Sequence, residues 1–248
     1  ARPVVWGGGL DGEAALLQWL GEQGEILGTP ARRLPDIQDP RIRQRRLRAL
    51  GVATPAIALQ HVPTRGRWLR KTRAQAGGFH VQWARPGDAL AAADYAQAFI
   101  AGRSLSVAFV ASEDTVEVLG FSAHLFWPSS SAPFGYGGAV GGVVLAPRLR
   151  RSISAAVPRI ARAFGLRGLA GIDFVLDAAG DWWLIEINAR PTATVELLTS
   201  PAAAWRAHVA ACRGEPWRPA RPRRRPRAQA VVLADDPIRV ANSLDWPA

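Results

Sequence analysis

Two carboxylates and one amide lie on two neighbouring stretches of the sequence that alternate like β-strands. Asp173 belongs to the first stretch, and Glu186 and Asn188 belong to the second. If the turn that joins the stretches is centred between Ala179 and Gly180, Asp173 lies directly opposite Glu186 on one face of a hairpin. Their Cβ atoms would then be about 5 Å apart. The sequence therefore predicts a compact group of oxygen atoms on this face.

Two carboxylates at this separation repel each other, so one of them has a raised pKa unless a cation lies between them. Carboxylate oxygens and the carbonyl oxygen of Asn188 are hard ligands, which suit Mg²⁺ better than zinc or copper. Magnesium bound by a few protein oxygens completes its shell with water and substrate phosphates. The alternative is structural: Asp173 is exposed at the hairpin edge, and Glu186 pairs with Arg190, which shares its face.

Lys71 is the second candidate. Lysine and arginine together number 31, and Lys71 is the only lysine among them. It precedes a loop of small residues, 74–78, that includes Gly77 and Gly78. A compact ammonium acts as a point charge on phosphate oxygens, and backbone N–H groups of a glycine-rich loop can surround a phosphate. The sequence thus indicates a phosphate contact, with an ordinary solvated lysine as the alternative.

The elements that position these groups follow from hydrophobic spacing. Asp39 is expected to cap a helix that begins at Pro40. Alternation along the second hairpin strand places Ile185 and Ile187 together on the face opposite Glu186. Residues 133–142 are expected to form a glycine-rich loop, and residues 231–245 one or two short strands. We expect strands at 4–6, 26–28, 67–71, 79–83, 95–100, 104–111, 116–126, 171–177 and 182–188, and helices at 10–20, 40–51, 150–164, 195–198 and 202–212.

The composition is that of a folded protein, because 48% hydrophobic and 21% charged residues exclude disorder and collagen-like structure. No apolar run approaches the ~20 residues that span a bilayer, so no membrane partner is expected. The single cysteine, Cys212, fits a reducing compartment, and we expect the cytoplasm. The net charge of +11 is attributed to G/C-rich codons that favour arginine. The absence of methionine indicates a processed chain or a fragment.

The sequence GIDFVLD at 171–177, followed by WLIEINARP at 183–191, resembles the metal-binding end of the ATP-grasp superfamily of carboxylate–amine ligases. Two features precede this hairpin in the order in which the family has them. They are Lys71 before a glycine-rich loop, and QAFIAGRS at 97–104. The resemblance covers residues 4–198. It implies an α/β fold with α+β subdomains, namely an ATP-grasp fold with a partial N-terminal α/β domain.

The resemblance also implies a division of the chain. The strand and glycine turn that contain Trp6 to Gly9 should then lie at an edge of a sheet that is incomplete or completed by a partner. The expected parts are a remnant of the N-terminal α/β domain at 1–55, a small ATP-grasp subdomain at 56–101, a large subdomain with the metal site at 102–215, a Pro/Arg linker at 216–227 and a short C-terminal segment at 228–248.

In the family, ATP lies between the two subdomains, and the resemblance implies a role for each matching residue. Two positions depart from the family pattern. Ala98 stands where relatives often carry Glu, and Arg41 follows Asp39-Pro40 where many relatives have a second phosphate-binding lysine, so Arg41 either replaces that contact or the contact is absent. The implied roles are phosphate contact for Lys71, a loop over the phosphates for Gly77 and Gly78, adenine pairing by backbone groups of Gln97, Ala98, Phe99 and Ile100, metal ligation for Asp173, Glu186 and Asn188, and contact with phosphate or substrate carboxylate for Arg190.

The implied function is an ATP- and Mg²⁺-dependent ligase that joins a small-molecule carboxylate to an amine through an acyl phosphate, with Lys71 and Arg190 as catalytic residues. A homo-oligomer is compatible with this function. The stretch FGYGGAVG at 134–141 resembles a substrate-side loop of a branch associated with bacterial one-carbon cofactor metabolism. This indicates a glutamate ligase in the biosynthesis of a methanofuran- or tetrahydromethanopterin-like cofactor.

Two alternatives stay open. One is a pseudoenzyme that binds nucleotide without turnover, which the departure at Arg41 favours. The other is a basic protein that binds nucleic acid through the arginines between Trp217 and Arg227, although four interleaved prolines and the lack of stacking aromatics disfavour it. The histidines show no metal-ligand spacing, and we expect packing or surface positions for all of them: His61, His80, His124 and His208.

Overall fold

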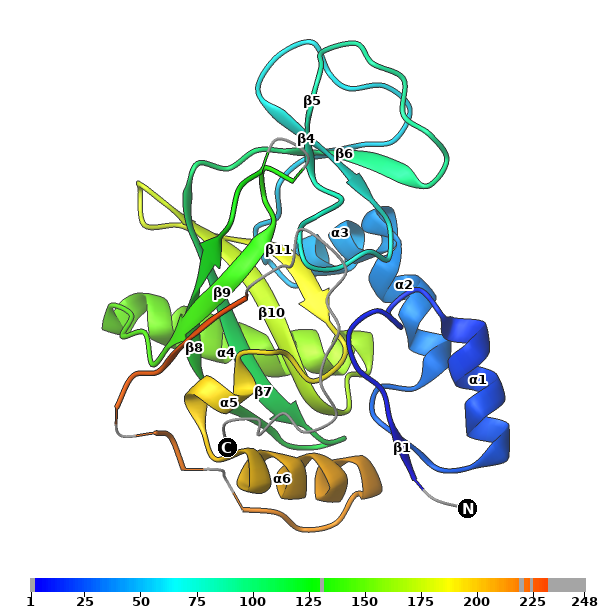
Figure 1. Cartoon of the computed structure of the whole chain (residues 1–248), viewed down its shortest axis with the longest axis vertical. Coiled ribbons are helices and arrows are strands. Elements are labelled where there is room, and N and C mark those ends of the chain that lie inside the picture. The colour runs from blue at the N-terminus through cyan, green and yellow to red at the C-terminus, as the bar shows by residue number, and fades with distance from the viewer. Residues whose placement is uncertain (1–2, 130–131, 219–220, 224, 232–248) are drawn as a thin grey trace, which may run out of the picture.

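The computed structural model describes residues 3–129, 132–218, 221–223 and 225–231. These residues form three β-sheets with flanking helices (Figure 1), which confirms the predicted mixed α/β fold. A four-stranded small sheet lies above a six-stranded large sheet, and helix α6 (Pro201–Arg213) lies below it. Residues 232–245, which carry most of the stretch where short C-terminal strands are expected, lie outside the described residues.

The N-terminal part contains a two-stranded parallel sheet of β1 (Val4–Val5) and β2 (Ile26–Leu27), so β1 lies at a sheet edge. Trp6 to Gly9, for which the edge position is predicted, follow β1 and belong to no strand. Helix α1 (Ala14–Gln23) begins later than residue 10, because Asp11 and Gly12 form a turn. A 3₁₀ turn (Ala31–Arg33), α2 (Leu34–Gln38) and α3 (Pro40–Ala49) follow.

Asp39 caps α3 as predicted. Its Oδ1 accepts hydrogen bonds from the backbone N–H groups of Arg41, at 2.7 Å, and Ile42, at 3.2 Å. The proline at the first helical position has no N–H to satisfy, which suits this end of a helix. The start of this helix is therefore stabilised by local residues, the cap of Asp39 and the proline that follows it.

The small sheet has the strand order β3-β6-β4-β5. Its central strand β4 carries Lys71, and antiparallel pairing places this residue opposite Tyr95 on β6. The strand expected at 79–83 is shorter and later, because Phe79 and His80 belong to turns and only three residues pair with β4. The strands are β3 (Ile57–Ala58), β4 (Trp68–Thr72), β5 (Gln82–Ala84) and β6 (Asp94–Ala98).

The large sheet has the order β11-β10-β7-β8-β9-β12, and both faces are packed. One face packs its apolar side chains, among them Phe109 and Phe174, against α4 (Pro147–Phe164). The other packs Ala108 and Val110 against α5 (Val195–Leu198) and α6. The strands are β7 (Gly102–Ala111), β8 (Val116–Phe126), β9 (Tyr136–Gly141), β10 (Gly168–Asp177), β11 (Trp182–Asn188) and β12 (Ala228–Ala230).

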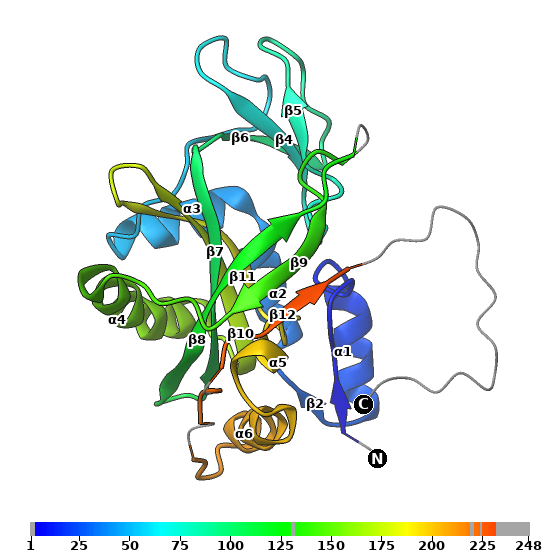
Figure 2. The ribbon, with the colours of Figure 1, turned by 60° about the vertical axis from the view of Figure 1, so that its left-hand side comes forward.

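The prediction of a glycine-rich loop at 133–142 is wrong, because residues 136–141 form β9 between β8 and β12 (Figure 2). At two of its glycines, neighbouring elements lie too close to leave room for a side chain. A Cβ at Gly141 would lie 2.5 Å from the Cβ of Leu197, and a Cβ at Gly138 would overlap the carbonyl oxygen of Gln229. Glycine inside a strand here marks close approach of other elements, which the sequence pattern does not distinguish from a loop.

The hairpin of β10 and β11 has the predicted pairing at the candidate site and a different pairing beyond it. Asp173 lies opposite Glu186, but from Phe174 towards the turn the register is shifted by one residue. The shift leaves Ile185 unpaired as a bulge, so Ile185 lines the cavity beside Glu186 instead of sharing the opposite face with Ile187, which is buried in the core. The prediction for Ile185 is therefore wrong.

Candidate active site

A cavity of about 390 Å³ lies between the small sheet and one face of the large sheet. The structure brings every residue predicted for the site to its wall. From the small sheet and its glycine loop come Lys71, Gly77 and Gly78, and from the end of β6 and the residues after it, called the hinge below, come Gln97, Ala98, Phe99 and Ile100. From the β10–β11 hairpin and the loop after it come Asp173, Glu186, Asn188 and Arg190.

The two hairpin carboxylates form the acidic side of the cavity. Burial, followed by the neighbouring charge of Asp173, raises the pKa of Glu186, while Lys71 and Arg190 are among the cations that oppose this shift. The Asn188 amide donates from Nδ2 to Asp173 Oδ2 at 3.0 Å, which leaves the Asn188 carbonyl oxygen as an acceptor. The donor set is thus three oxygen-bearing side chains, which fits Mg²⁺.

No cluster of three His, Cys, Asp or Glu side chains able to hold a metal occurs in the described part of the chain. The candidate set holds only two carboxylates and completes its ligands with an amide. A cation bound there would need water or ligand oxygens to fill its shell, which is the usual state of Mg²⁺ at phosphate-binding sites.

Lys71 is only 6% exposed, so the alternative of a solvated surface lysine is wrong. Its Nζ donates to Oε1 of Gln97 at 3.2 Å, across the β4–β6 pair. His80 lies on the same side of the cavity, where burial, followed by the charge of Lys71, lowers the pKa of the imidazole. The pair therefore offers one cation and one neutral ring to a ligand.

The glycine loop beside Lys71 packs against the start of β9 and the residues just before it. Gly77 and Gly78 have φ of 76° and 75°, a conformation that favours glycine. The carbonyl oxygen of Gly77 accepts from the N–H of Tyr136 at 2.9 Å, and a Cβ at Gly78 would overlap the carbonyl oxygen of Phe134. The large sheet thus holds this loop over the cavity.

The hinge residues are engaged in different ways. The N–H groups of Ala98 and Phe99 already donate, to the carbonyl oxygens of Ala56 at 2.8 Å and Arg67 at 2.9 Å. The N–H of Ile100 has no acceptor among the described residues. A ligand that pairs with the hinge through an N–H group would therefore meet Ile100.

Arg190 pairs with Asp11, so the alternative in which it pairs with Glu186 is wrong. Its Nε donates to Asp11 Oδ2 at 3.0 Å, and Asp11 is only 5% exposed. Sequence reasoning missed Asp11. The available signal was an acid within a glycine-rich turn, but its partner lies 179 residues away.

Arg41 does not line the cavity. Its side chain is 64% exposed and pairs with Asp39 at 3.3 Å. The buried arginine of the same helix is Arg43, which donates to the carbonyl oxygen of Ile37 at 2.9 Å. Of the two readings of this departure, the structure therefore supports the absence of the second phosphate contact.

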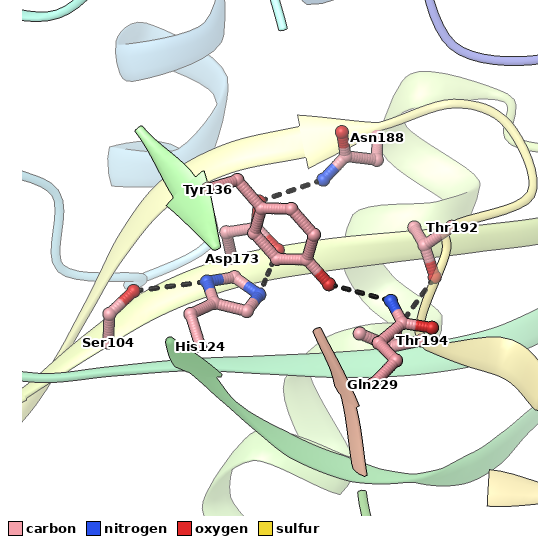
Figure 3. A network of polar contacts seen from close by, with 8 residues as sticks. All are labelled: Ser104, His124, Tyr136, Asp173, Asn188, Thr192, Thr194 and Gln229. Carbon is pink, nitrogen blue, oxygen red and sulfur yellow. Dashed lines mark hydrogen bonds and ion pairs between the residues drawn. The ribbon is translucent and has the colours of Figure 1, made fainter. Parts of the chain in front are cut away.

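His124 is the second residue that sequence reasoning missed. Figure 3 shows it between Ser104 and Asp173, with Nδ1 at 3.1 Å from Ser104 Oγ and Nε2 at 3.8 Å from Asp173 Oδ1. Its ring packs edge-on against Tyr136, with centroids 5.7 Å apart. The available signal in the sequence was the position of His124 on an expected strand, 116–126. Side chains two residues apart share a face of a strand, so alternation gives the face on which His124 lies.

The cavity brings together a buried lysine from the small sheet and a carboxylate pair from the large sheet. The family description "ATP-grasp domain" matches residues 37–194, more than half of the chain. The chain therefore belongs to the ATP-grasp family. No curated protein matches it.

Solved structures give the same fold. The biotin carboxylase domain of the Hydrogenobacter thermophilus 2-oxoglutarate carboxylase, solved with MgADP and bicarbonate, has a TM-score of 0.73 at 16% identity over 89% of this chain and 55% of that one. An ATP-grasp superfamily protein from Archaeoglobus fulgidus has a TM-score of 0.61 at 22% identity, over 84% of this chain and 63% of that one. The L-amino acid ligase from Bacillus licheniformis has a TM-score of 0.60 at 18% identity, over 80% of this chain and 52% of that one. The chain spans between half and two thirds of these structures.

In the described residues, no helix is long and apolar enough to span a membrane.

Proposed function

We propose that the chain binds ATP with Mg²⁺ and forms the nucleotide-binding part of a ligase that joins a carboxylate to an amine. One observation carries the proposal: the buried ammonium of Lys71 and the opposed carboxylates of Asp173 and Glu186 converge on one cavity from two different sheets. Such a site can hold a polyphosphate and a cation at once.

Each residue then has a defined task. Lys71 contacts phosphate oxygens, and the glycine loop excludes water from them. Asp173, Glu186 and the Asn188 carbonyl hold Mg²⁺, which supplies charge neutralisation during phosphoryl transfer when it is bound. The Arg190 guanidinium, held by Asp11, orients the substrate carboxylate or its phosphorylated form. Positioning and electrostatics suffice for this chemistry, so no protein nucleophile is required.

The proposed overall reaction consumes ATP, a carboxylate and an amine and yields ADP, phosphate and an amide. Glutamate is the proposed amino-acid substrate, joined to a precursor of a methanofuran- or tetrahydromethanopterin-like cofactor. The support is the likeness of the sequence at 134–141, most of which forms β9 in this chain, to a substrate-side segment of that branch, together with the position of Tyr136 and Phe134 at the cavity. The cytoplasm is the proposed location, which the single cysteine supports.

The test is phosphate release from Mg-ATP, with glutamate and other carboxylates in the presence of hydroxylamine, which converts acyl phosphates to coloured hydroxamates. The expected result is release and hydroxamate formation that depend on one carboxylate and are lost in Arg190→Gln. Arg70→Gln, an exposed arginine on β4, is the matched control and should keep both activities. Tight Mg-ATP binding without release for any carboxylate would favour the pseudoenzyme instead.

A further inference from the structure

One wall of the cavity carries a polar network (Figure 3) in which Tyr136 and Gln229 have none of the proposed tasks. Tyr136, the first residue of β9, lines the cavity beside His124. Its hydroxyl contacts the side-chain amide of Gln229, which lies on β12, at 2.9 Å. Burial raises the pKa of Tyr136, so the phenol is protonated at neutral pH. The direction in which that proton points decides what the phenol can bind.

The orientation of the Gln229 amide determines where the phenol proton of Tyr136 points. As drawn in Figure 3, its nitrogen faces Tyr136 and its oxygen faces only acceptors. Turned by 180°, the amide satisfies every neighbour: its nitrogen donates to the Ala193 carbonyl oxygen at 3.2 Å and to Glu196 Oε1 at 2.8 Å, and its oxygen accepts from Tyr136. The orientation of a side-chain amide is assigned from its hydrogen-bond network. Only the turned orientation pairs every donor of this group with an acceptor.

The phenol proton is therefore committed to Gln229, and the phenolic oxygen keeps a lone pair that can accept. No other described residue donates to that oxygen. The carboxylate of Glu196, which is not among the proposed Mg²⁺ ligands, acts on Tyr136, so it favours a positive group there. A donor that carries positive charge is the ligand group that fits.

We propose that the phenolic oxygen of Tyr136 accepts a hydrogen bond from the amino group of the acceptor substrate, and that Gln229 is the positioning residue that fixes it as an acceptor. This inference rests on the proposed ligase function and adds the place where the amine binds. The subsite lies beside Asp173, so an amine held there is next to the proposed phosphoryl-transfer centre.

The chain offers a direct probe, because Tyr95 and Tyr136 are its only tyrosines. Labelling with 3-fluorotyrosine gives one ¹⁹F resonance for each, and Tyr95→Phe assigns them. We would titrate propylamine, tetramethylammonium and propionate, both with and without Mg²⁺ and a non-hydrolysable ATP analogue. Propylamine has a positive charge and N–H donors, and tetramethylammonium has the charge alone. Propionate can only accept a hydrogen bond, so it would bind only a phenol that donates its proton. The expected result is a saturable shift of the Tyr136 resonance with propylamine only.

Variants separate the two roles. Tyr136→Phe should weaken propylamine binding, measured by calorimetry, about 10-fold, the loss of one hydrogen bond to a charged group, while Tyr95→Phe keeps it. Gln229→Leu releases the phenol proton, so propionate, which should not shift the Tyr136 resonance of the unmodified chain, should now shift it. Gln60→Leu, at an exposed position, should change neither response. A purely structural role of Gln229 would not create a response of Tyr136 to propionate.

A Tyr136 resonance that propylamine leaves unmoved, or that propionate moves in the unmodified chain, would overturn the inference. Failure of the proposed function has a different signature: the ATP analogue then fails to bind in calorimetry. The amine titration without nucleotide still decides the role of Tyr136 in that case.

Discussion

Lys71 combines features that rarely occur together in a lysine, since it is buried, hydrogen-bonded to Gln97 and directed at a cavity with two carboxylates. Lys71→Arg keeps the charge but replaces a point donor by a planar fork in a restricted space. We expect a loss of about 2–3 kcal/mol in transition-state stabilisation, the scale of one misplaced preorganised donor. The measurement is kcat/KM for ATP turnover, or Mg-ATP affinity by titration.

Arg70→Lys makes the matched exchange on the same strand at an exposed position and should have no effect on either quantity. Near-normal turnover and affinity in Lys71→Arg would mean that the ammonium makes no phosphate contact. The sequence could identify Lys71 because its residue type is unique in the chain, whereas Asp11 and His124 have no such mark. Their importance depends on partners brought together only by the tertiary fold.

At the level of elements, the hairpin shows how a correct site can arise from an incorrect turn. The turn is not centred between Ala179 and Gly180, but the bulge at Ile185 restores the pairing of Asp173 with Glu186. Alternation could predict both strands, because apolar periodicity is local. It could not predict the bulge or β9, because each depends on how a neighbouring strand packs.

Helix α6 docks on β10 through a histidine that should report on pH. His208 is fully buried, its Nδ1 accepts from the N–H of Leu169 at 2.8 Å, and burial lowers its pKa. The unfolded chain then binds a proton more readily, so the free energy of unfolding should fall as pH drops below the ordinary histidine value of about 6.5. His80 contributes a slope of the same sign.

Urea unfolding of the chain and of His208→Gln between about pH 7.5 and about pH 5.5 checks this expectation. The variant should lose part of the slope, and His61→Gln, an exposed histidine, should retain all of it. Identical slopes in His208→Gln and the unmodified chain would show that His208 does not resist protonation.

For the whole molecule, the ion pair of Arg190 with Asp11 joins the N-terminal segment to the loop after β11. Asp11→Asn leaves the enclosed guanidinium without its counter-charge, and we expect the free energy of unfolding to fall by about 3 kcal/mol. Glu113→Gln removes the acid of an exposed pair with Arg167 and should cost under about 1 kcal/mol. Urea unfolding measures both, and equal effects would contradict a structural role for the buried pair.

The central claim is that Asp173 and Glu186 hold the cation through which ATP is bound. Calorimetric titration of Mg-ATP into the chain and into the double variant Asp173→Asn with Glu186→Gln tests it most directly. The exposed acids Asp181 and Glu22, changed together to Asn and Gln, provide the control. We predict Mg²⁺-dependent binding that the control retains and the double variant weakens by about 100-fold, the loss of two charge-assisted contacts. Unchanged Mg-ATP affinity in the double variant would contradict the account.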